Sequence, residues 1–229
     1  VLSAGASFGM LMILSTLMDL NGVVFLDEVT YMIVLDAIKG FPSLKIVPVK
    51  LNDDGVDIND LEEKVLKHKF APAHGKMFYG CYYTIPTFHN PTGILFSDEV
   101  CKALITLARK HDFLVICDDV YNMLHYDDEK PPKRLFFFFL DSDSDYKGHV
   151  ISNGTFSKIL APGTRVGWME CPPRITEEFK KNGFLNSGGA INNYTSGVIG
   201  SMIELGLADE QLRESSRQYK EQREALCDV

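Results

Sequence analysis

Four polar clusters in this sequence contain residue types that could do chemistry. The last of them along the chain ends with a lysine and an arginine. The segment 152–158 is Ser-Asn-Gly-Thr-Phe-Ser-Lys, and Arg165 follows Lys158 by seven positions. A lysine after small hydroxyl residues, with an arginine nearby, can combine an amine nucleophile with an anion site. A serine nucleophile with Ser-x-x-Lys spacing is excluded, because Thr155 occupies the position that the serine needs. Taken alone, Lys158 is explained as a solvated surface lysine without any function.

Two further clusters follow stretches that are typical of strands. The segment 118–121, Asp-Asp-Val-Tyr, comes directly after the apolar run Phe113–Cys117, which suits a strand buried on both faces. The carboxyl end of such a strand would present one aspartate to a ligand crevice, although a surface aspartate pair needs no crevice. The segment 90–93, Asn-Pro-Thr-Gly, follows the run Phe78–Thr84. It also needs no function as a turn, since Asn-Pro and Gly are turn formers.

The remaining cluster lies near the start of the chain. The segment 5–9 is Gly-Ala-Ser-Phe-Gly, directly before the apolar pattern of Phe8–Leu20. Backbone N–H groups at the start of a helix, aided by the helix dipole, can hold a phosphate. A plain helix-entry turn explains the same residues, so this cluster alone assigns no ligand.

The elements that would position these clusters alternate between strand and helix over some 160 residues. We expect strands at Val23–Leu26, Leu44–Val49, Phe78–Thr84, Phe113–Cys117, Val150–Ser152 and Val166–Met169. We expect helices at Phe8–Leu20, Tyr31–Lys39, Asn59–His68 and Ser97–Lys110, the last with Ser97 as its N-cap. Such alternation predicts an α/β fold with a mainly parallel sheet. A helical tail begins at about residue 172, with helices expected at Ile175–Lys181, Ile191–Gly206 and Glu210–Leu226.

Composition narrows the class of protein. Hydrophobic residues make up 45% and charged residues 24% of the 229 residues, which is typical of a globular protein. The net charge of -8 argues against nucleic acid or an anionic membrane as the main partner, and no apolar run is long enough to cross a bilayer. The five scattered cysteines favour a reducing compartment. No spacing of metal ligands is found, and a calcium loop at 50–61 is excluded because Lys50 and Leu61 stand at ligand positions.

Two features stand apart from these patterns. The run Phe136–Phe139, beside the acidic stretch Asp141–Asp145, would be an aggregation hazard if it were exposed. The chain begins with Val1 rather than Met and ends at Val229 inside a helical pattern. We therefore expect it to be a fragment of a longer protein.

Taken together and in order, the motifs HNPTG, DDVY and SK…R resemble those of the fold type I pyridoxal-phosphate enzymes, specifically the class I and II aminotransferases. Asp118 follows Asn90 by 28 residues, Tyr121 follows Asp118 by 3, and Arg165 follows Lys158 by 7, which also matches the family. Within the family, the sequence is most similar to the branch that contains 2-aminoadipate and kynurenine aminotransferases and the aminotransferase-like domains of certain bacterial regulators. The resemblance runs from Gly5 to about Trp168, and more loosely to the end.

The resemblance implies a role for each motif residue, with pyridoxal 5'-phosphate as the cofactor. Lys158 would form the Schiff base with the cofactor and shuttle the substrate's α-proton. Asp118 would pair with the pyridine nitrogen and keep it protonated. Asn90 and Tyr121 would hydrogen-bond the phenolic oxygen, and Tyr31 would stack on the ring.

The phosphate would be held by the backbone N–H groups of Ala6 and Ser7, by Arg165 and by Ser157, with Thr155 as the alternative hydroxyl. Ala6 departs from the serine that is usual in this branch, although backbone N–H donation survives this change. Thr164 replaces a more usual apolar residue beside Arg165.

The resemblance also implies the fold and the activity of the intact protein. The whole chain, residues 1–229, would be the cofactor-binding large domain, with a mostly parallel seven-stranded sheet flanked by helices. The intact protein would move an amino group between an amino acid and a 2-oxo acid, as a cytoplasmic homodimer. The arginine that binds the substrate carboxylate belongs to a small domain that this chain lacks. The alternatives are a lyase or cyclising synthase on the same cofactor, a regulator's cofactor-binding domain, or an inactive truncation.

Overall fold

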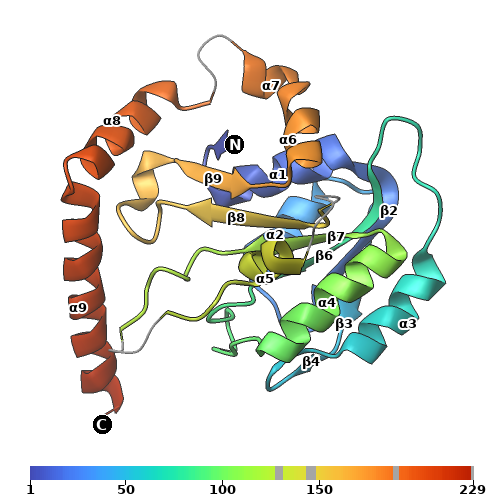
Figure 1. The fold of residues 1–229 in the computed structure, drawn as a ribbon, viewed down its shortest axis with the longest axis horizontal. Coiled ribbons are helices and arrows are strands. Elements are labelled where there is room, and N and C mark those ends of the chain that lie inside the picture. Colours follow the sequence, from blue (N-terminus) through green and yellow to red (C-terminus); the bar gives the residue numbers. More distant parts are fainter. Residues whose placement is uncertain (127–130, 143–147, 188–190, 228–229) are drawn as a thin grey trace.

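A computed structural model of the chain (Figure 1) describes residues 1–126, 131–142, 148–187 and 191–227. Its strands are β1 (Leu2–Ser3), β2 (Met18–Asp27), β3 (Lys45–Val49), β4 (Leu51–Asn52), β5 (Gly55–Val56), β6 (Phe78–Thr84), β7 (Leu114–Asp118), β8 (Val150–Thr155) and β9 (Gly167–Glu170). Its helices are α1 (Ala6–Leu17), α2 (Met32–Lys39), α3 (Ile58–His68), α4 (Asp98–His111), α5 (Leu135–Ser142), α6 (Pro173–Lys180), α7 (Gly183–Asn186), α8 (Asn193–Glu204) and α9 (Leu207–Cys227). The expected α/β class is confirmed.

Seven of the strands form one sheet in the order β1-β9-β8-β7-β6-β2-β3. Neighbours from β8 to β3 run parallel, whereas β9 runs antiparallel to both β8 and β1. The expectation of a mostly parallel seven-stranded sheet is therefore confirmed. In a parallel sheet all carboxyl ends meet at one edge, so the residues that follow β2, β6, β7 and β8 are brought together there.

Helices cover both faces of the sheet (Figure 1). On one face, α3, α4 and α5 bury an apolar cluster that includes Phe25, Leu104 and Phe113. On the other face, α1, α2 and α6 pack over a second cluster that includes Ile13, Ile116 and Phe179. Strands between two helical layers are buried on both sides, which explains the unbroken apolar runs in the sequence.

The expected helix over Phe8–Leu20 is wrong at its carboxyl end. The helix α1 stops at Leu17, and Met18 adopts an extended backbone that begins β2. Asp19 stabilises the entry to this strand, because its carboxylate accepts hydrogen bonds from the backbone N–H groups of Asn21 and Ala73 at 2.9 and 2.8 Å. Apolar residues continue across the junction, so the helical pattern carries no mark of where the helix ends.

Most other expected elements lie within a few residues of their observed bounds. Ser97 caps α4 as expected, since its Oγ accepts from the backbone N–H of Val100 at 3.2 Å. The short strand β1 and the β4–β5 hairpin were not expected, because two-residue strands leave almost no pattern in a sequence. In α5, Phe136 and Phe138 are buried while Phe137 is exposed, so most of the described phenylalanine run is covered.

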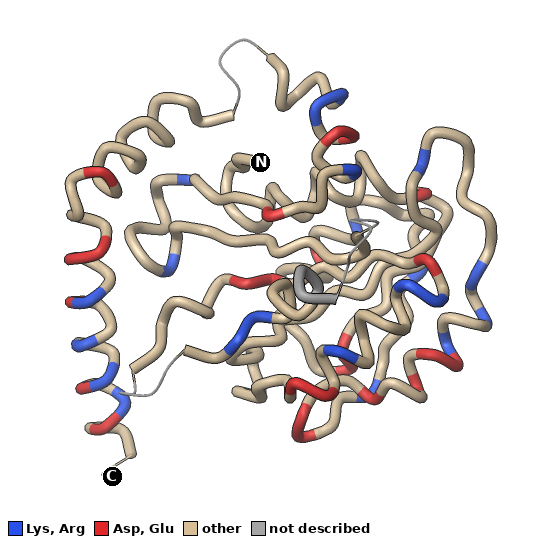
Figure 2. The backbone as a smooth tube through the Cα atoms, viewed as in Figure 1, with Lys and Arg blue, Asp and Glu red and all other residues tan. Residues whose placement is uncertain are grey.

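Charge is mixed over the surface helices. Figure 2 shows Lys and Arg interspersed with Asp and Glu along α9 and over α3 and α4. The described part of the chain contains no helix that is long and apolar enough to cross a membrane.

Candidate active site

A cavity of about 250 Å³ opens at the carboxyl edge of the sheet. Its walls come from the start of α1, the start of α2, the end of β7 and the turns after β8. The lining residues are Ala6, Ser7, Tyr31, Ile33, Ile85, Asp118, Val120, Tyr121, Thr155, Ser157, Lys158, Pro162 and Arg165. Every residue proposed from the sequence lines this cavity except Asn90, which reaches it through Tyr121.

Asp118 ends β7 and is only 7% exposed. Its Oδ2 accepts a hydrogen bond from the Tyr83 hydroxyl at 2.6 Å, and Oδ1 accepts a longer one from Asn153 at 3.4 Å. Burial raises the pKa of Asp118 to about 6, although these hydrogen bonds and the charge of Lys158 act in the opposite direction. A carboxylate held this way would be stabilised by a cationic hydrogen-bond donor inside the cavity.

Asn153 and Tyr83 are site residues that the sequence analysis missed. Asn153 lies directly across from Asp118 in the β7–β8 ladder, and its Nδ2 donates to the carbonyl oxygen of Ala6 at 2.9 Å. It therefore connects the carboxylate to the first turn of α1. The sequence could have indicated Asn153, because neighbouring parallel strands that end at the same edge of a sheet place their last residues side by side.

Gly9 makes this connection sterically feasible. A Cβ added at Gly9 would lie 2.2 Å from Oδ1 of Asn153, so only glycine allows α1 to approach β8 this closely. Oδ1 itself is buried and has no hydrogen-bond partner among the described residues. The contact between helix and strand thus sets the distance between the start of α1 and Asp118.

The end of the cavity at the start of α1 is suited to an anion. The helix α1 begins after Gly5, whose φ of 91° favours glycine, and no side chain caps its first turn in the described structure. The Arg165 guanidinium lies against Gly5 and donates to the carbonyl oxygen of Ala4 at 3.0 Å. Uncapped N–H groups beside a guanidinium form an anion site.

Two hydroxyl groups line the same end. The Thr155 hydroxyl donates to Ser157 Oγ at 3.0 Å, and Thr155 Oγ1 accepts from the Ser157 backbone N–H at 3.1 Å. Thr155 is buried and occupied by these contacts, whereas Ser157 is half-buried at the cavity wall. Ser157 is accordingly the better placed of the two hydroxyls to bind an anion directly.

Lys158 follows in the turn after β8 and is solvent-exposed in this chain. It lines the cavity together with Asp118, and its charge acts on that carboxylate. The amine and the carboxylate therefore face one space, with the anion end beside them.

Two tyrosines form the remaining wall. Tyr31 precedes α2, and burial, followed by the nearby Tyr121 and Asp118, raises the pKa of its phenol. Asn90 Nδ2 donates to the Tyr121 hydroxyl at 3.0 Å, which ties the loop after β6 to the segment after β7. Tyr121 and Asn90 also line an adjoining cavity of about 430 Å³.

The described part of the chain holds no group of three or more His, Cys, Asp or Glu side chains that could bind a metal ion.

The sheet, its flanking helices and a lysine-bearing cavity at the carboxyl edge define a fold type I transferase domain, as in solved aminotransferase structures. The chain belongs to the family described as "Aminotransferase class I and II", whose profile matches residues 1–229.

Individual relatives carry aminotransferase names. An aromatic-amino-acid aminotransferase of Thermococcus litoralis is 32% identical, with 89% of this chain and 46% of the relative covered. An uncharacterized aminotransferase of Saccharolobus solfataricus is 31% identical, with 99% and 53% covered. The crystal structure of Pyrococcus horikoshii kynurenine aminotransferase, solved with PMP, has a TM-score of 0.80 at 29% identity and covers 100% of this chain and 53% of its own. The chain spans about half the length of the curated relatives that it matches.

The residues of the cavity fit pyridoxal phosphate. This cofactor combines a phosphate, a basic ring nitrogen and an aldehyde, so its site needs an anion cradle, an acid and an amine. The start of α1 with Arg165, the buried Asp118 and Lys158 supply these three functions around one space. Burial raises the pKa of Asp118 to about 6, and a cationic hydrogen-bond donor beside it would favour its ionised form.

Proposed function

We propose that the whole protein is a pyridoxal-phosphate-dependent aminotransferase that moves an amino group between an amino acid and a 2-oxo acid. Residues 1–229 form its cofactor-binding large domain, and the helices from about residue 172 lead towards the rest of the protein. The observation that carries the proposal is the joint lining of one cavity by Lys158, Asp118 and the anion end at α1. Bound pyridoxal phosphate supplies an aldehyde for the lysine amine and a protonated ring that withdraws electrons from the substrate.

Lys158 is the catalytic amine and the general base of this proposal. With the cofactor bound, the lysine amine would bond to its aldehyde and, once released by the substrate amine, would carry the proton from the substrate α-carbon. Lys158 lies in the turn after β8 and lines the cavity. Asp118 would hold a proton on the ring nitrogen, and its burial at the end of β7 would strengthen this interaction.

The phosphate would be held by the first N–H groups of α1, Ala6 and Ser7 among them, by Arg165 and by Ser157 with Thr155 behind it. The helix dipole, the guanidinium and the hydroxyl would all act on the phosphate and so orient the cofactor. Asp118 and Tyr31, which line the same cavity, would contact its ring.

Tyr121 and Asn90 donate to the phenolic oxygen of the ring. Their mutual hydrogen bond of 3.0 Å keeps both polar groups at the same point of the cavity wall. Hydrogen bonds to an ionised oxygen favour its charged form. With the cofactor bound, these two residues would thereby stabilise the ionised form of its phenolic oxygen.

The remaining expectations concern assembly and location. Met32 is 73% exposed, and its neighbour Ile33 is exposed while lining the cavity, so apolar surface surrounds the site opening. A second copy of the protein that covers this rim would complete a homodimer. The described cysteines are all free, which suits the reducing environment of the cytoplasm.

The first test of the cofactor site is covalent trapping. The purified chain and the full-length protein that contains it are incubated with pyridoxal phosphate, the visible band is recorded, and borohydride reduction is followed by peptide mapping. We expect the label on Lys158, and no label or band in Lys158→Ala. Lys67→Ala, which removes an exposed lysine of α3, is the control and should trap like the parent.

The reaction is then tested on the full-length protein. Aromatic amino acids and kynurenine are the first donors to screen, because the names of two relatives point to them. Formation of the new amino acid from a 2-oxo acid supports transamination, whereas loss of a substituent or ring closure identifies a lyase or synthase. Trapping at Lys158 without turnover of any donor would favour a cofactor-binding regulator domain, and a colourless full-length protein would overturn the enzyme assignment.

A further inference from the structure

A buried polar cluster lies behind the candidate active site, beside the cluster of α3 and α4. Asp27, at the end of β2, accepts hydrogen bonds from the hydroxyls of Tyr82 and, at 2.7 Å, Thr84 of β6. The Nε2 atom of His89 lies 3.3 Å from Oδ2 of the same carboxylate, and both side chains are fully buried. None of these residues lines the cavity that holds Lys158.

His89 also reaches forward into the loop that follows β6. Its Nδ1 lies 2.8 Å from the Thr92 hydroxyl, and its backbone exchanges hydrogen bonds with Gly93 and Ile94 at 2.6 and 2.9 Å. The loop therefore folds back on His89, with one contact to its imidazole and two hydrogen bonds to its backbone.

The hydroxyl of Thr92 joins the imidazole to the loop backbone, because Oγ1 contacts Nδ1 of His89 and also accepts from the N–H of Ile94 at 3.4 Å. On the other side of the ring, Nε2 faces the carboxylate of Asp27 at 3.3 Å, without a formed hydrogen bond among the described residues. His89 thus lies between the end of β2 and the loop after β6, in contact with both.

We propose that His89 is a positioning residue of the active site, which fixes the adjacent Asn90 so that its amide points at Tyr121 and the cofactor. Asn90 has no other side-chain hydrogen bond among the described contacts than the one to Tyr121. Its direction is therefore set by the backbone, and that backbone is held by the Asp27–His89–Thr92 chain. This inference rests on the proposed function, since it acts through the cofactor contact of Asn90.

The test is a pH titration of the visible cofactor band in the full-length protein, with the melting temperature measured alongside. Asn90→Ala removes one donor to the phenolic oxygen and should raise the midpoint of the band by about one unit. His89→Leu should shift the midpoint in the same direction by about half a unit or more. His89→Gln keeps an N–H for Asp27 and should restore most of the parent midpoint.

The double variant His89→Leu/Asn90→Ala separates positioning from general damage. If His89 acts through Asn90, the double variant titrates like Asn90→Ala alone, because the shifts are not additive. The matched control is His111→Leu, which removes another buried histidine from its carboxylate, Glu62 at 2.8 Å, at the far end of α4. His111→Leu should lower the melting temperature and leave the midpoint of the band's pH titration unchanged.

Two results would overturn the inference while the proposed function stands. In the first, His89→Leu keeps the midpoint of the parent protein although its melting temperature is lower. In the second, His89→Leu shifts the midpoint of the Asn90→Ala variant by as much as it shifts that of the parent. Two other results would contradict the cofactor contact on which the inference rests. These are a parent protein that shows no trapped band and an Asn90→Ala variant whose midpoint does not shift.

Discussion

At the scale of single residues, the ionised carboxylate of Asp118 would favour cofactor binding but lowers the stability of the fold. Its carboxylate is placed to meet a cation, yet in the chain without cofactor it is buried with a pKa raised to about 6. Ionising it therefore works against folding. A site that awaits a charged ligand commonly lowers the stability of the empty protein.

Asp118→Asn should stabilise the cofactor-free chain in a pH-dependent way. The folded pKa of about 6 lies above the ordinary value of 3.8, so the stability from this group is complete below pH 3.8 and is lost as the pH rises through 6. We expect a gain of about 2–3 kcal/mol in the variant above pH 6 and none below pH 4. Urea unfolding at a series of pH values measures this.

The neighbouring Asp119 gives a matched control. Burial raises its pKa to about 6 as well, but it accepts from Ser152 and lies near Arg134, on the other face of the sheet. Asp119→Asn should show a similar dependence of stability on pH while cofactor binding stays unchanged. A pH-independent effect of Asp118→Asn, or equal loss of cofactor in both variants, would contradict this account.

Sequence reasoning proposed candidate site residues that stand in motifs and did not propose those that act through register. Lys158, Asp118 and Asn90 follow expected strands; Lys158 and Asp118 line one cavity, and Asn90 bonds to Tyr121 in its wall. Tyr83 was seen only as a strand residue, because alternation along β6 does not say which hydroxyl meets a carboxylate. That contact depends on how β6 and β7 are aligned, which no local pattern records.

At the scale of elements, the junction between α1 and β8 decides the geometry of the anion end. Asn153 ties the first turn of α1 to the sheet, and Gly9 leaves the space for it. The start of a helix can serve as an anion site only when its axis points at the ligand. Gly9 therefore affects phosphate binding indirectly, because it determines how closely α1 packs against β8.

Gly9→Ala should weaken both the fold and cofactor binding. The new methyl group would overlap Oδ1 of Asn153, so the helix must move away at a cost of about 1–3 kcal/mol. The affinity for pyridoxal phosphate should fall about tenfold or more as the first turn of α1 is displaced. Fluorescence titration and urea unfolding report the two effects.

Gly200→Ala in α8 is the corresponding control. A Cβ there meets nothing within 4 Å, so the substitution should stabilise its helix by about 0.5–1 kcal/mol and leave cofactor affinity alone. If both glycine variants behaved alike, helix propensity rather than the contact with Asn153 would explain the result.

The sequence predicted some elements much better than others, for physical reasons. The strand β6 and the capped helix α4 were expected at or near their observed bounds, since β-rich residues and a Ser97 cap mark them locally. The end of α1 was missed because its apolar residues continue into β2, and tertiary contacts of Asp19 decide where the strand begins.

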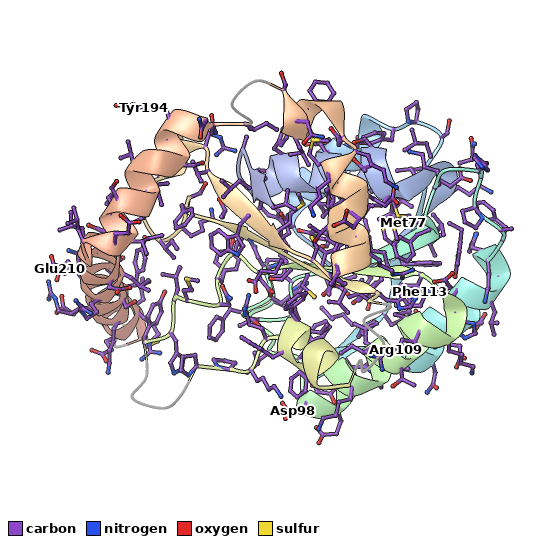
Figure 3. All side chains as sticks on the ribbon, turned by 45° about the horizontal axis from the view of Figure 1, so that its top comes forward. Met77, Asp98, Arg109, Phe113, Tyr194 and Glu210 are labelled. Atoms are coloured by element: carbon purple, nitrogen blue, oxygen red, sulfur yellow. The ribbon has the colours of Figure 1, made fainter. Side chains whose placement is uncertain are left out.

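At the scale of the whole molecule, the two last helices differ from the sheet domain. They lie along one side of it (Figure 1), and no described residue of α9 is buried. Tyr194 near the start of α8 is 86% exposed and projects outwards (Figure 3). Leu212 of α9 lines a cavity of about 320 Å³ with residues such as Phe156 and Trp168, and Tyr219 and Arg223 of α9 contact the ring of Tyr126.

We therefore expect α9 to open independently of the sheet in this chain. Hydrogen exchange should be orders of magnitude faster for amides of α9 than for those of the fully buried β6 and β7. Leu212→Asp should speed exchange in α9 further and leave β6 unchanged. Equal protection of α9 and β6 would show that the helix is part of the cooperative core.

The strand β6 places two adjacent tyrosines on opposite faces of the sheet. Tyr82 meets Asp27 in the network behind the site, and Tyr83 meets Asp118 at the cavity. Deleting or inserting one residue within 78–84 would exchange the two faces, so each hydroxyl would lose its carboxylate at once. In terms of evolutionary freedom, this strand can accept substitutions one side chain at a time, but changes of length are confined to the loops at its ends.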